Sequence, residues 1–337
     1  MTTIEMAHTP AAPPPSVPPK RKSRGRRFIL ILLALAVLVV FGAIAFLVWT
    51  ESKIDRIPAT ELQSLTEAGG MRNILVVGTD SRENLPEDFE GKFGDFGGSR
   101  TDVIMLAHVV DGRGQLLSIP RDYKVEVPGH GTDKVNAAYV YGGPDLLVQT
   151  VQNNLGIPVH NYVEIDFFGF ANVVDALGGI TMTFDHRVRD LKSGLDLPAG
   201  THTLNGAQAL AYARSRSFEE RRGGEWHSVN GTDLGRTGRQ QELLMLMLDQ
   251  ATSPGRAFNL PGFTTAFAEQ ITADEGLSLG VIADLGRSVL GLRSGEIEAM
   301  TLPVDITTID GVSYVVPNGA TQPVITAFIN GDRYPVQ

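Results

Sequence analysis

The chain has 337 residues, 42% of them hydrophobic and 20% charged, and its net charge at pH 7 is −9. This length accommodates one large domain or two ordinary ones, and the composition is that of a globular protein. The absence of cysteine excludes disulfides and thiolate metal sites.

The first 50 residues differ in composition from the rest of the chain. Residues 1–27 are rich in proline and then in basic side chains, a composition that cannot bury a core, so we expect a cytoplasmic tail. Residues 28–50 contain no charged side chain, and about 20 apolar residues are enough to cross a bilayer as a helix. The Lys and Arg residues directly before this span predict one transmembrane helix in the plasma membrane, with the N-terminus in the cytoplasm. A cleaved signal peptide is the alternative, but its apolar core would be shorter and no small-x-small site follows here.

The part beyond the span is predicted to lie outside the membrane. Residues 51–70 have the mixed polarity of a tether, and residues 71–337 show the pattern of one α/β domain. Because residues 1–27 hold six basic side chains and one acidic one, the remainder is more acidic than the whole chain. This disfavours a general attraction to nucleic acid, and clusters of arginine in this part need an explanation.

Short runs of Val, Ile and Leu alternate with helical patterns along the domain. Residues 73–78, 102–110 and 115–119 read as buried strands, with a tight hairpin at "DGRG" between the last two. Further strands are predicted at 161–165, 180–184 and 297–303, and a hairpin at 306–316. Helices are predicted at 143–156, 166–179, 204–216, 238–250 and 278–291, with a last helix after Gly319. The fold class is therefore α/β, with a central mixed sheet flanked by helices and preceded by one transmembrane helix.

Charged residues lie at one end of each of the first three strands. If the second strand runs antiparallel to the first and third, these ends meet at one edge of the sheet. The residues concerned are Asp80, Arg82, Arg100, Asp102, Arg121 and Asp122.

A second charged cluster follows the helix predicted at 204–216. Arg214 and Arg216 fall at the C-terminal end of that helix, where it enters a loop. The start of the next helix carries an acid, two arginines and an amide, with Asp233 or Thr237 as the N-cap. These residues are Asp233, Arg236, Arg239 and Gln240.

Carboxylates and arginines mixed in this way suggest a metal-bridged pyrophosphate. Mg²⁺ prefers one or two carboxylates together with phosphate oxygens and water. Arginine forks and a helix N-terminus both bind phosphate oxygens. Each Asp–Arg pair taken alone is more often a surface ion pair of little energetic value.

Six segments occur in the order seen in one protein family. They are "NILVVGTDSR", "SRTDVIMLAHV", "LLSIPRDYKVEVPGHGTDKVNAAYVYGGP", "VVDALGGI", "LNGAQALAYARSRS" and "GTDLGRTGRQQ". In these segments the chain resembles the LytR-CpsA-Psr family, most closely over residues 72–250. The resemblance implies a LytR-CpsA-Psr catalytic domain over residues 71–337, on the outer face of the bacterial plasma membrane.

The resemblance also implies a reaction and roles for the two clusters. Family members are thought to transfer a glycopolymer from a polyprenyl-pyrophosphate carrier to the muramic acid 6-hydroxyl of peptidoglycan, through a phosphodiester bond. They use Mg²⁺, or Mn²⁺ in its place, and hold the prenyl chain in an apolar tunnel. By motif, Asp80 and Asp102 would be the metal-associated carboxylates. Arg121, Asp122, Asp233 and Arg236 would take part in catalysis. The pyrophosphate would be bound by Arg82, Arg100, Arg121, Arg214, Arg216, Arg236, Arg239 and Gln240.

Two other functions are compatible with the same site. With water as the nucleophile it would be a polyprenyl-pyrophosphate hydrolase. Without turnover it would be a lipid-phosphate-binding regulator of the cell envelope. The sequence does not identify the glycopolymer.

Overall fold

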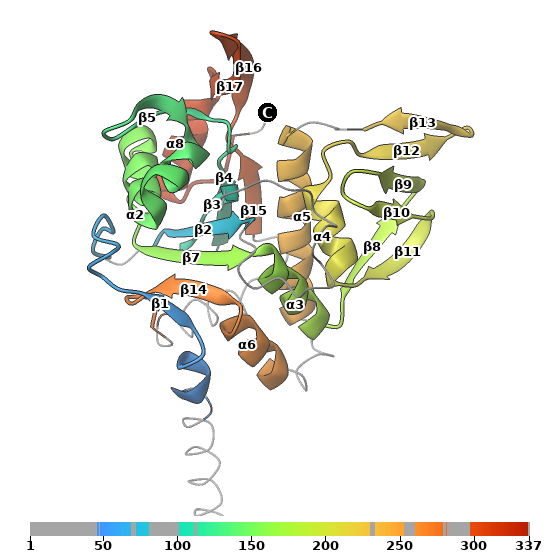
Figure 1. Cartoon of the computed structure of the whole chain (residues 1–337), viewed down its shortest axis with the longest axis horizontal. Coiled ribbons are helices and arrows are strands. Elements are labelled where there is room, and N and C mark those ends of the chain that lie inside the picture. The colour runs from blue at the N-terminus through green and yellow to red at the C-terminus, as the bar shows by residue number, and fades with distance from the viewer. Residues whose placement is uncertain are drawn as a thin grey trace, which may run out of the picture. The chain divides into compact units, whose positions relative to one another are not determined.

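A seven-stranded mixed sheet is the largest sheet in the part of the chain that the structure describes (Figure 1). The structure, a computed structural model, describes residues 46, 48–68, 72–80, 101–110, 113–229, 233–252, 260–278, 281 and 297–335. The sheet order is β1 (Asp55–Ile57), β14 (Ile271–Asp274), β7 (Asn161–Asp166), β2 (Ile74–Thr79), β3 (Thr101–Val110), β4 (Arg113–Ser118) and β15 (Ile297–Thr301). The strands predicted at 73–78, 102–110 and 115–119 are β2, β3 and β4, with ends that agree within two residues.

The direction of β3 was the open question in the sequence. It pairs antiparallel with both β2 and β4, while β2 and β7 are parallel neighbours. The start of β3 therefore lies at the same end of the sheet as the end of β2. The expected mixed α/β fold is confirmed.

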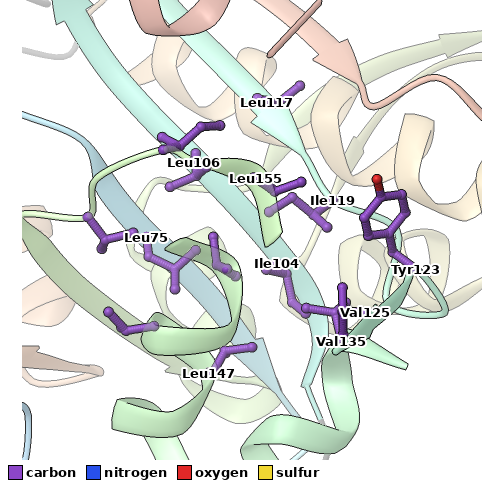
Figure 2. Packing of buried hydrophobic residues seen from close by; sticks show 14 of the residues in the cluster. Leu75, Ile104, Leu106, Leu117, Ile119, Tyr123, Val125, Val135, Leu147 and Leu155 are labelled. Carbon is purple, nitrogen blue, oxygen red and sulfur yellow. The ribbon is translucent and has the colours of Figure 1, made fainter. Parts of the chain in front are cut away.

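One core joins the sheet to helices α2 (Val135–Leu155) and α8 (Thr321–Asn330). Figure 2 shows Leu75, Leu106 and Leu117 of the strands in the same cluster as Leu147 and Leu155 of α2. Several of these side chains are fully buried, and each such leucine contributes roughly 1.5–3 kcal/mol to folding. This packing fixes the strands whose ends carry the charged residues.

Helix α2 begins earlier than the sequence predicts. Gly142 and Gly143 depart from helical geometry, and Gly143 has a φ of 65°. The prediction began at Gly143 because a Gly-Gly-Pro sequence normally marks a helix boundary. The structure adds a short helical segment before this kink, and that segment ends at Tyr141.

A second hydrophobic core involves two of the smaller sheets, a two-stranded and a four-stranded one. It joins helices α4 (Gly206–Arg214) and α5 (Asp233–Thr252) to the ribbon β8 (Ile180–Phe184)–β11 (Gly200–Leu204). The same core includes side chains of β9 (Arg187–Asp190) and β10 (Leu195–Leu197). Strands β12 (Glu219–Arg222) and β13 (Glu225–Ser228) extend the sheet of β9 and β10.

The remaining described elements pack around these cores. Helix α3 (Phe167–Ala176) contacts α4 and α6 (Leu260–Ala268). Two hairpins complete the fold, β5 (Lys124–Val127)–β6 (Gly131–Lys134) and β16 (Val304–Ile309)–β17 (Val312–Pro317). The second is the hairpin predicted at 306–316.

The region predicted as a tether differs in the structure. Strand β1 pairs in parallel with β14, and Leu62 is buried in the main core. A strand of only three residues is too short to give an alternating pattern, so its sequence resembles a linker. Residues 51–68 are therefore part of the fold. The predicted membrane span at 28–50 lies almost entirely outside the described residues, and within those residues no helix is long and apolar enough to span a membrane.

Gly206 allows α3 and α4 to approach closely. A Cβ atom at this position would lie 2.1 Å from the carbonyl oxygen of Ala171. We expect Gly206→Ala to lower the free energy of unfolding by about 2–3 kcal/mol, because the backbones must separate. Urea denaturation followed by circular dichroism measures this loss.

The matched control is Gly238→Ala in α5, where a Cβ atom would meet nothing within 4 Å. Because alanine favours helix, this variant is expected to be unchanged or more stable by up to about 1 kcal/mol. Equal losses in the two variants would contradict the close-approach explanation.

Candidate functional site

The end of the sheet where β2 finishes and β3 starts carries the first charged cluster. Thr79, the last residue of β2, pairs with Thr101, the first of β3, so Asp80 and Asp102 lie at this same end. After β4 the chain continues beside β3, and the backbone of Ile119 donates to the carbonyl of Ile104 at 2.8 Å. Of the other predicted members, Arg82 and Arg100 lie outside the described residues.

Arg121 forms the first contact of the site. Its Nη1 lies 2.5 Å from Oδ1 of Asp102, and both side chains are 17% exposed. In this position the guanidinium is mostly shielded from water, so its charge acts over short distances more strongly than on an open surface. The Arg-Asp sequence that follows β4 thus places a cation against the carboxylate at the start of β3.

Helix α5 brings the second charged cluster to the same carboxylate. Nη1 of Arg236 lies 3.5 Å from Oδ1 of Asp102, and the Arg236 side chain is 4% exposed. One turn and a half later Gln241 donates to Oγ of Ser118 at 2.8 Å, across 123 positions of sequence. The two clusters predicted separately therefore meet at Asp102.

Asp122 lies between two cations. Its Oδ1 is 2.8 Å from Nζ of Lys134, and its Oδ2 is 3.7 Å from Nε of Arg121. Lys134 is the last residue of β6 and was not among the predicted site residues. The pairing leaves Asp122 partly exposed, at 18%, beside Arg121.

The segment after α4 is organised by a buried aspartate. Asp190 is 1% exposed and accepts hydrogen bonds from the Ser215 hydroxyl at 2.7 Å and from the backbone amides of Lys192, Arg216 and Ser217. Burial by itself would raise the pKa of Asp190, but these hydrogen bonds outweigh it and the pKa lies below the ordinary 3.8. Asp190 thereby fixes the backbone of the segment that carries Arg214 and Arg216.

The other predicted binding residues occupy this same junction. Helix α4 ends at Arg214, two residues before the predicted end at 216, and the Arg214 guanidinium lies 4.9 Å from the ring centroid of Phe167. Arg239 is buried, donates to the carbonyl oxygen of Ser215, and lies 5.1 Å from the ring centroid of Phe218. Burial lowers the pKa of Arg239, against the opposing effects of nearby acidic groups.

Helix α5 starts at Asp233, which corrects one expectation. Thr237 lies one turn inside the helix and therefore cannot be its N-cap. The side chain of Asp233 lies outside the part that the structure describes. Gln240 donates to the carbonyl oxygen of Ala213 at 3.3 Å, so it ties α5 to α4. Contact of Arg214, Arg216, Arg239 and Gln240 with a pyrophosphate stays a prediction.

Comparison with known proteins assigns the family. The model of the LytR_cpsA_psr family matches residues 48–327. The chain belongs to the LytR-CpsA-Psr family. The matched residues include all seven strands of the main sheet, from β1 to β15, and both charged clusters.

Individual relatives agree with this assignment. The chain is 39% identical over 281 residues to the probable cell wall biosynthesis protein LcpB of Corynebacterium glutamicum, which covers 81% of this chain and 63% of LcpB. It is 36% identical over 187 residues to the polyisoprenyl-teichoic acid–peptidoglycan teichoic acid transferase TagT of Bacillus subtilis, which covers 54% of this chain and 53% of TagT. The matched region thus spans less than two thirds of each of these two relatives.

Solved structures of family members share the fold. A LytR-Csp2A-Psr enzyme from Actinomyces oris superposes with a TM-score of 0.67 at 29% identity, covering 82% of this chain and 95% of that one. TagT with bound octaprenyl pyrophosphate lipid superposes with a TM-score of 0.55 at 27% identity, covering 78% of this chain and 90% of that one.

One acidic residue near the LytR-CpsA-Psr site was missed by the sequence analysis. Glu164 of β7 accepts hydrogen bonds from three hydroxyls, those of Thr79 at 3.3 Å, Tyr139 at 2.9 Å and Tyr162 at 2.7 Å. The only signal was a glutamate inside the otherwise apolar strand "NYVEI". The network connects α2 and β7 to the end of β2, directly before Asp80.

The residues present fit a hard divalent cation. Asp80 and Asp102 offer carboxylates at the same end of neighbouring strands, and such ions favour oxygen ligands. The Thr101 hydroxyl is buried and has no hydrogen-bond partner in the described structure, so an oxygen is available in the residue before Asp102. No group of three or more His, Asp or Glu residues that could hold a metal occurs within the described residues.

Proposed function

We propose that this protein is a phosphotransferase that attaches a glycopolymer to peptidoglycan, using a polyprenyl-pyrophosphate-linked donor. The observation that carries the proposal is the convergence of Arg121 and Arg236 on Asp102. Two shielded guanidinium groups beside a carboxylate at an edge of a sheet suit a pyrophosphate, because arginine binds phosphate oxygens in a fixed fork. The transferase name of TagT and the lipid bound in its structure support the same reaction.

The chemistry follows from these residues. The muramic acid 6-hydroxyl attacks the phosphorus linked to the sugar, a P–O bond forms, and the bond to the departing polyprenyl phosphate breaks. Arg121 and Arg236 stabilise the negative charge that develops on the phosphate oxygens, and Asp102 holds the two guanidinium groups in place. Asp122 or Asp233 accepts the proton of the attacking hydroxyl.

A divalent cation would be held by Asp80 and Asp102. Mg²⁺, or Mn²⁺ in its place, would supply further neutralisation of the phosphate charge. We expect chelation with EDTA to lower the transfer rate at least about tenfold, and added Mg²⁺ to restore it. A rate that does not change after chelation and dialysis would exclude the metal.

We further propose that the protein is anchored in the plasma membrane by residues 28–50, with the catalytic domain outside. The uncharged span and the basic residues before it support this location. Protease treatment of intact cells and of lysed cells distinguishes the two orientations.

The transfer reaction is tested with the full-length protein in detergent, Mg²⁺, a lipid-linked glycopolymer and peptidoglycan. We expect a phosphodiester-linked product, detected by mass spectrometry after muramidase digestion. Release of free phosphorylated sugar in the presence of acceptor would indicate a hydrolase instead. Lipid binding with no turnover would indicate a regulator.

A further inference from the structure

Three elements place aromatic and charged side chains beside Asp122. They are the hairpin β5–β6, the helical segment of α2 before its kink, and strand β17. Val315 of β17 donates to the carbonyl oxygen of Asp122 at 3.0 Å and forms a bridge with Tyr123. The figure shows β5, α2 and the hairpin β16–β17 in the same part of the molecule (Figure 1).

Tyr141 is the most prominent side chain of this patch. It is 46% exposed, so a large part of its surface is accessible to a ligand. The ring of His130 stacks on it with a centroid distance of 4.5 Å and an interplanar angle of 9°. Its hydroxyl donates to Oδ2 of Asp133 at 2.6 Å, so the ring is held in one orientation while much of it stays open to solvent.

Tyr314 of β17 adds a second ring. Nζ of Lys134 lies 5.9 Å from its ring centroid. The hydrogen bond to Asp133 and the charge of Asp133 raise the pKa of Tyr141, with smaller effects from burial and from Tyr314. Asp133 and Lys134 are consecutive residues of β6, so Tyr141 and Tyr314 contact neighbouring positions of one strand. We call His130, Asp133, Lys134, Tyr141 and Tyr314 the aromatic platform.

The aromatic platform is directly connected to the proposed reaction centre. Lys134 binds one oxygen of Asp122, and Arg121 approaches the other. A molecule bound to the platform next to Lys134 would therefore be separated only by Asp122 from Arg121, the guanidinium proposed to bind phosphate.

The chemistry of the platform indicates the kind of molecule that it binds. One face of a pyranose ring carries C–H groups and stacks on aromatic rings, while its hydroxyls donate to carboxylates. The charges beside the platform balance, because Asp122 and Asp133 are matched by Lys134 and Arg121, whereas Asp102 has two arginine partners. The platform therefore lacks the excess of positive charge that a phosphate requires, while an uncharged sugar does not need it. This distinguishes a glycan backbone from the pyrophosphate end of the donor.

We propose that the aromatic platform is the acceptor subsite, where a sugar of the peptidoglycan glycan strand stacks on Tyr141 and Tyr314 beside Asp122. The proposal rests on the transferase function proposed above. It assigns a binding role to residues outside the two arginine clusters. It also gives a role to the exposed ring of Tyr141.

Tyr141→Ala tests the proposal in full-length protein. Steady-state transfer is measured with saturating lipid-linked donor and varied amounts of a soluble, uncrosslinked fragment of the glycan strand. We expect the KM for the fragment to rise about fivefold or more, with kcat changed less than about twofold, because the lost stacking acts on acceptor binding. Tyr141→Phe keeps the ring and is expected to raise KM by no more than about threefold. Leu191→Ala, at a side chain that is 79% exposed on the β9–β10 turn, is the control for loss of an exposed apolar group.

Binding measurements separate this proposal from the transferase function. Calorimetric titration with the glycan fragment alone should show weaker binding to Tyr141→Ala than to the wild type. Titration with octaprenyl pyrophosphate should give equal affinities for the two proteins. Glycan binding that is lost in the variant supports the platform even if no transfer is detected. An unchanged KM and an unchanged glycan affinity, or a loss of octaprenyl pyrophosphate binding instead, would overturn it.

Discussion

Replacing Arg236 with alanine is expected to lower the rate of transfer about a hundredfold or more. Arg236 is 4% exposed and contacts Asp102 from a different part of the chain than Arg121 does. Its removal takes a preorganised positive charge away from the phosphate, and losses of this kind typically cost a factor of about 10²–10³ in kcat. Asp102 also loses one of its two cationic partners and becomes less well oriented.

The lipid retained by the purified protein gives a second readout. Mass spectrometry of a detergent extract should detect a polyprenyl phosphate or pyrophosphate with the wild type and none with Arg236→Ala or Arg121→Ala. Arg221→Ala is the matched control, because Arg221 is an exposed arginine of the β12–β13 hairpin. Equal retention in all the variants would mean that Arg121 and Arg236 do not bind the headgroup. Thermal denaturation of each variant shows whether a loss reflects unfolding.

Replacing Asp190 with asparagine is expected to lower the free energy of unfolding by about 3 kcal/mol. Asp190 is buried and accepts four hydrogen bonds shorter than 3 Å from Ser215, Lys192, Arg216 and Ser217. An amide in its place brings an NH₂ group toward these donors and removes the charge that strengthens the bonds. Transfer activity should fall as well, since Asp190 fixes the backbone that carries Arg214 and Arg216.

The pH dependence of stability isolates the charge of Asp190. The pKa of this carboxyl in the folded protein lies below the ordinary value of 3.8. Its contribution is therefore complete above about pH 4–5 and is lost as the pH falls from 3.8 through the folded-state value. Urea denaturation between pH 6 and pH 3 should show a shallower acid loss in Asp190→Asn than in the wild type. Asp196→Asn, an exposed partner of Arg187, is the control and should change stability by less than about 1 kcal/mol. Parallel acid losses in the wild type and in Asp190→Asn would contradict this assignment.

The edge of the sheet could be predicted from sequence because strand ends are visible as changes in composition. Asp102 and Arg121 lie where apolar runs begin or stop, and the hairpin predicted from "DGRG" agrees with the antiparallel pairing of β3 and β4. The direction of β3 relative to β2 could not be predicted from the sequence, because the hairpin relates β3 only to β4. The pairing of Thr79 with Thr101 supplied it.

Contacts between distant segments could not be predicted in the same way. The position of α5 beside Asp102 depends on the packing of a helix against a sheet, for which the helical pattern gives a face but no partner. Glu164 was missed because its partners Tyr139 and Tyr162 come from a helix and a strand that are adjacent only after folding. Strand β1 was missed because three residues carry no period. The sequence therefore predicts which residues carry charge at strand and helix ends, while their partners follow from tertiary packing.

Arg121 and Arg236, which both contact Asp102, lie far apart in the sequence. A nascent or truncated chain that ends before α5 contains Asp102 and Arg121 but lacks Arg236 and the bond from Gln241 to Ser118. Contacts between such distant positions require closure of a long loop, which costs conformational entropy before the contact can form. If the two arginines bind phosphate as proposed, capture would require that the chain has been made and folded at least through α5 (Asp233–Thr252), so a shorter molecule would not sequester carrier lipid.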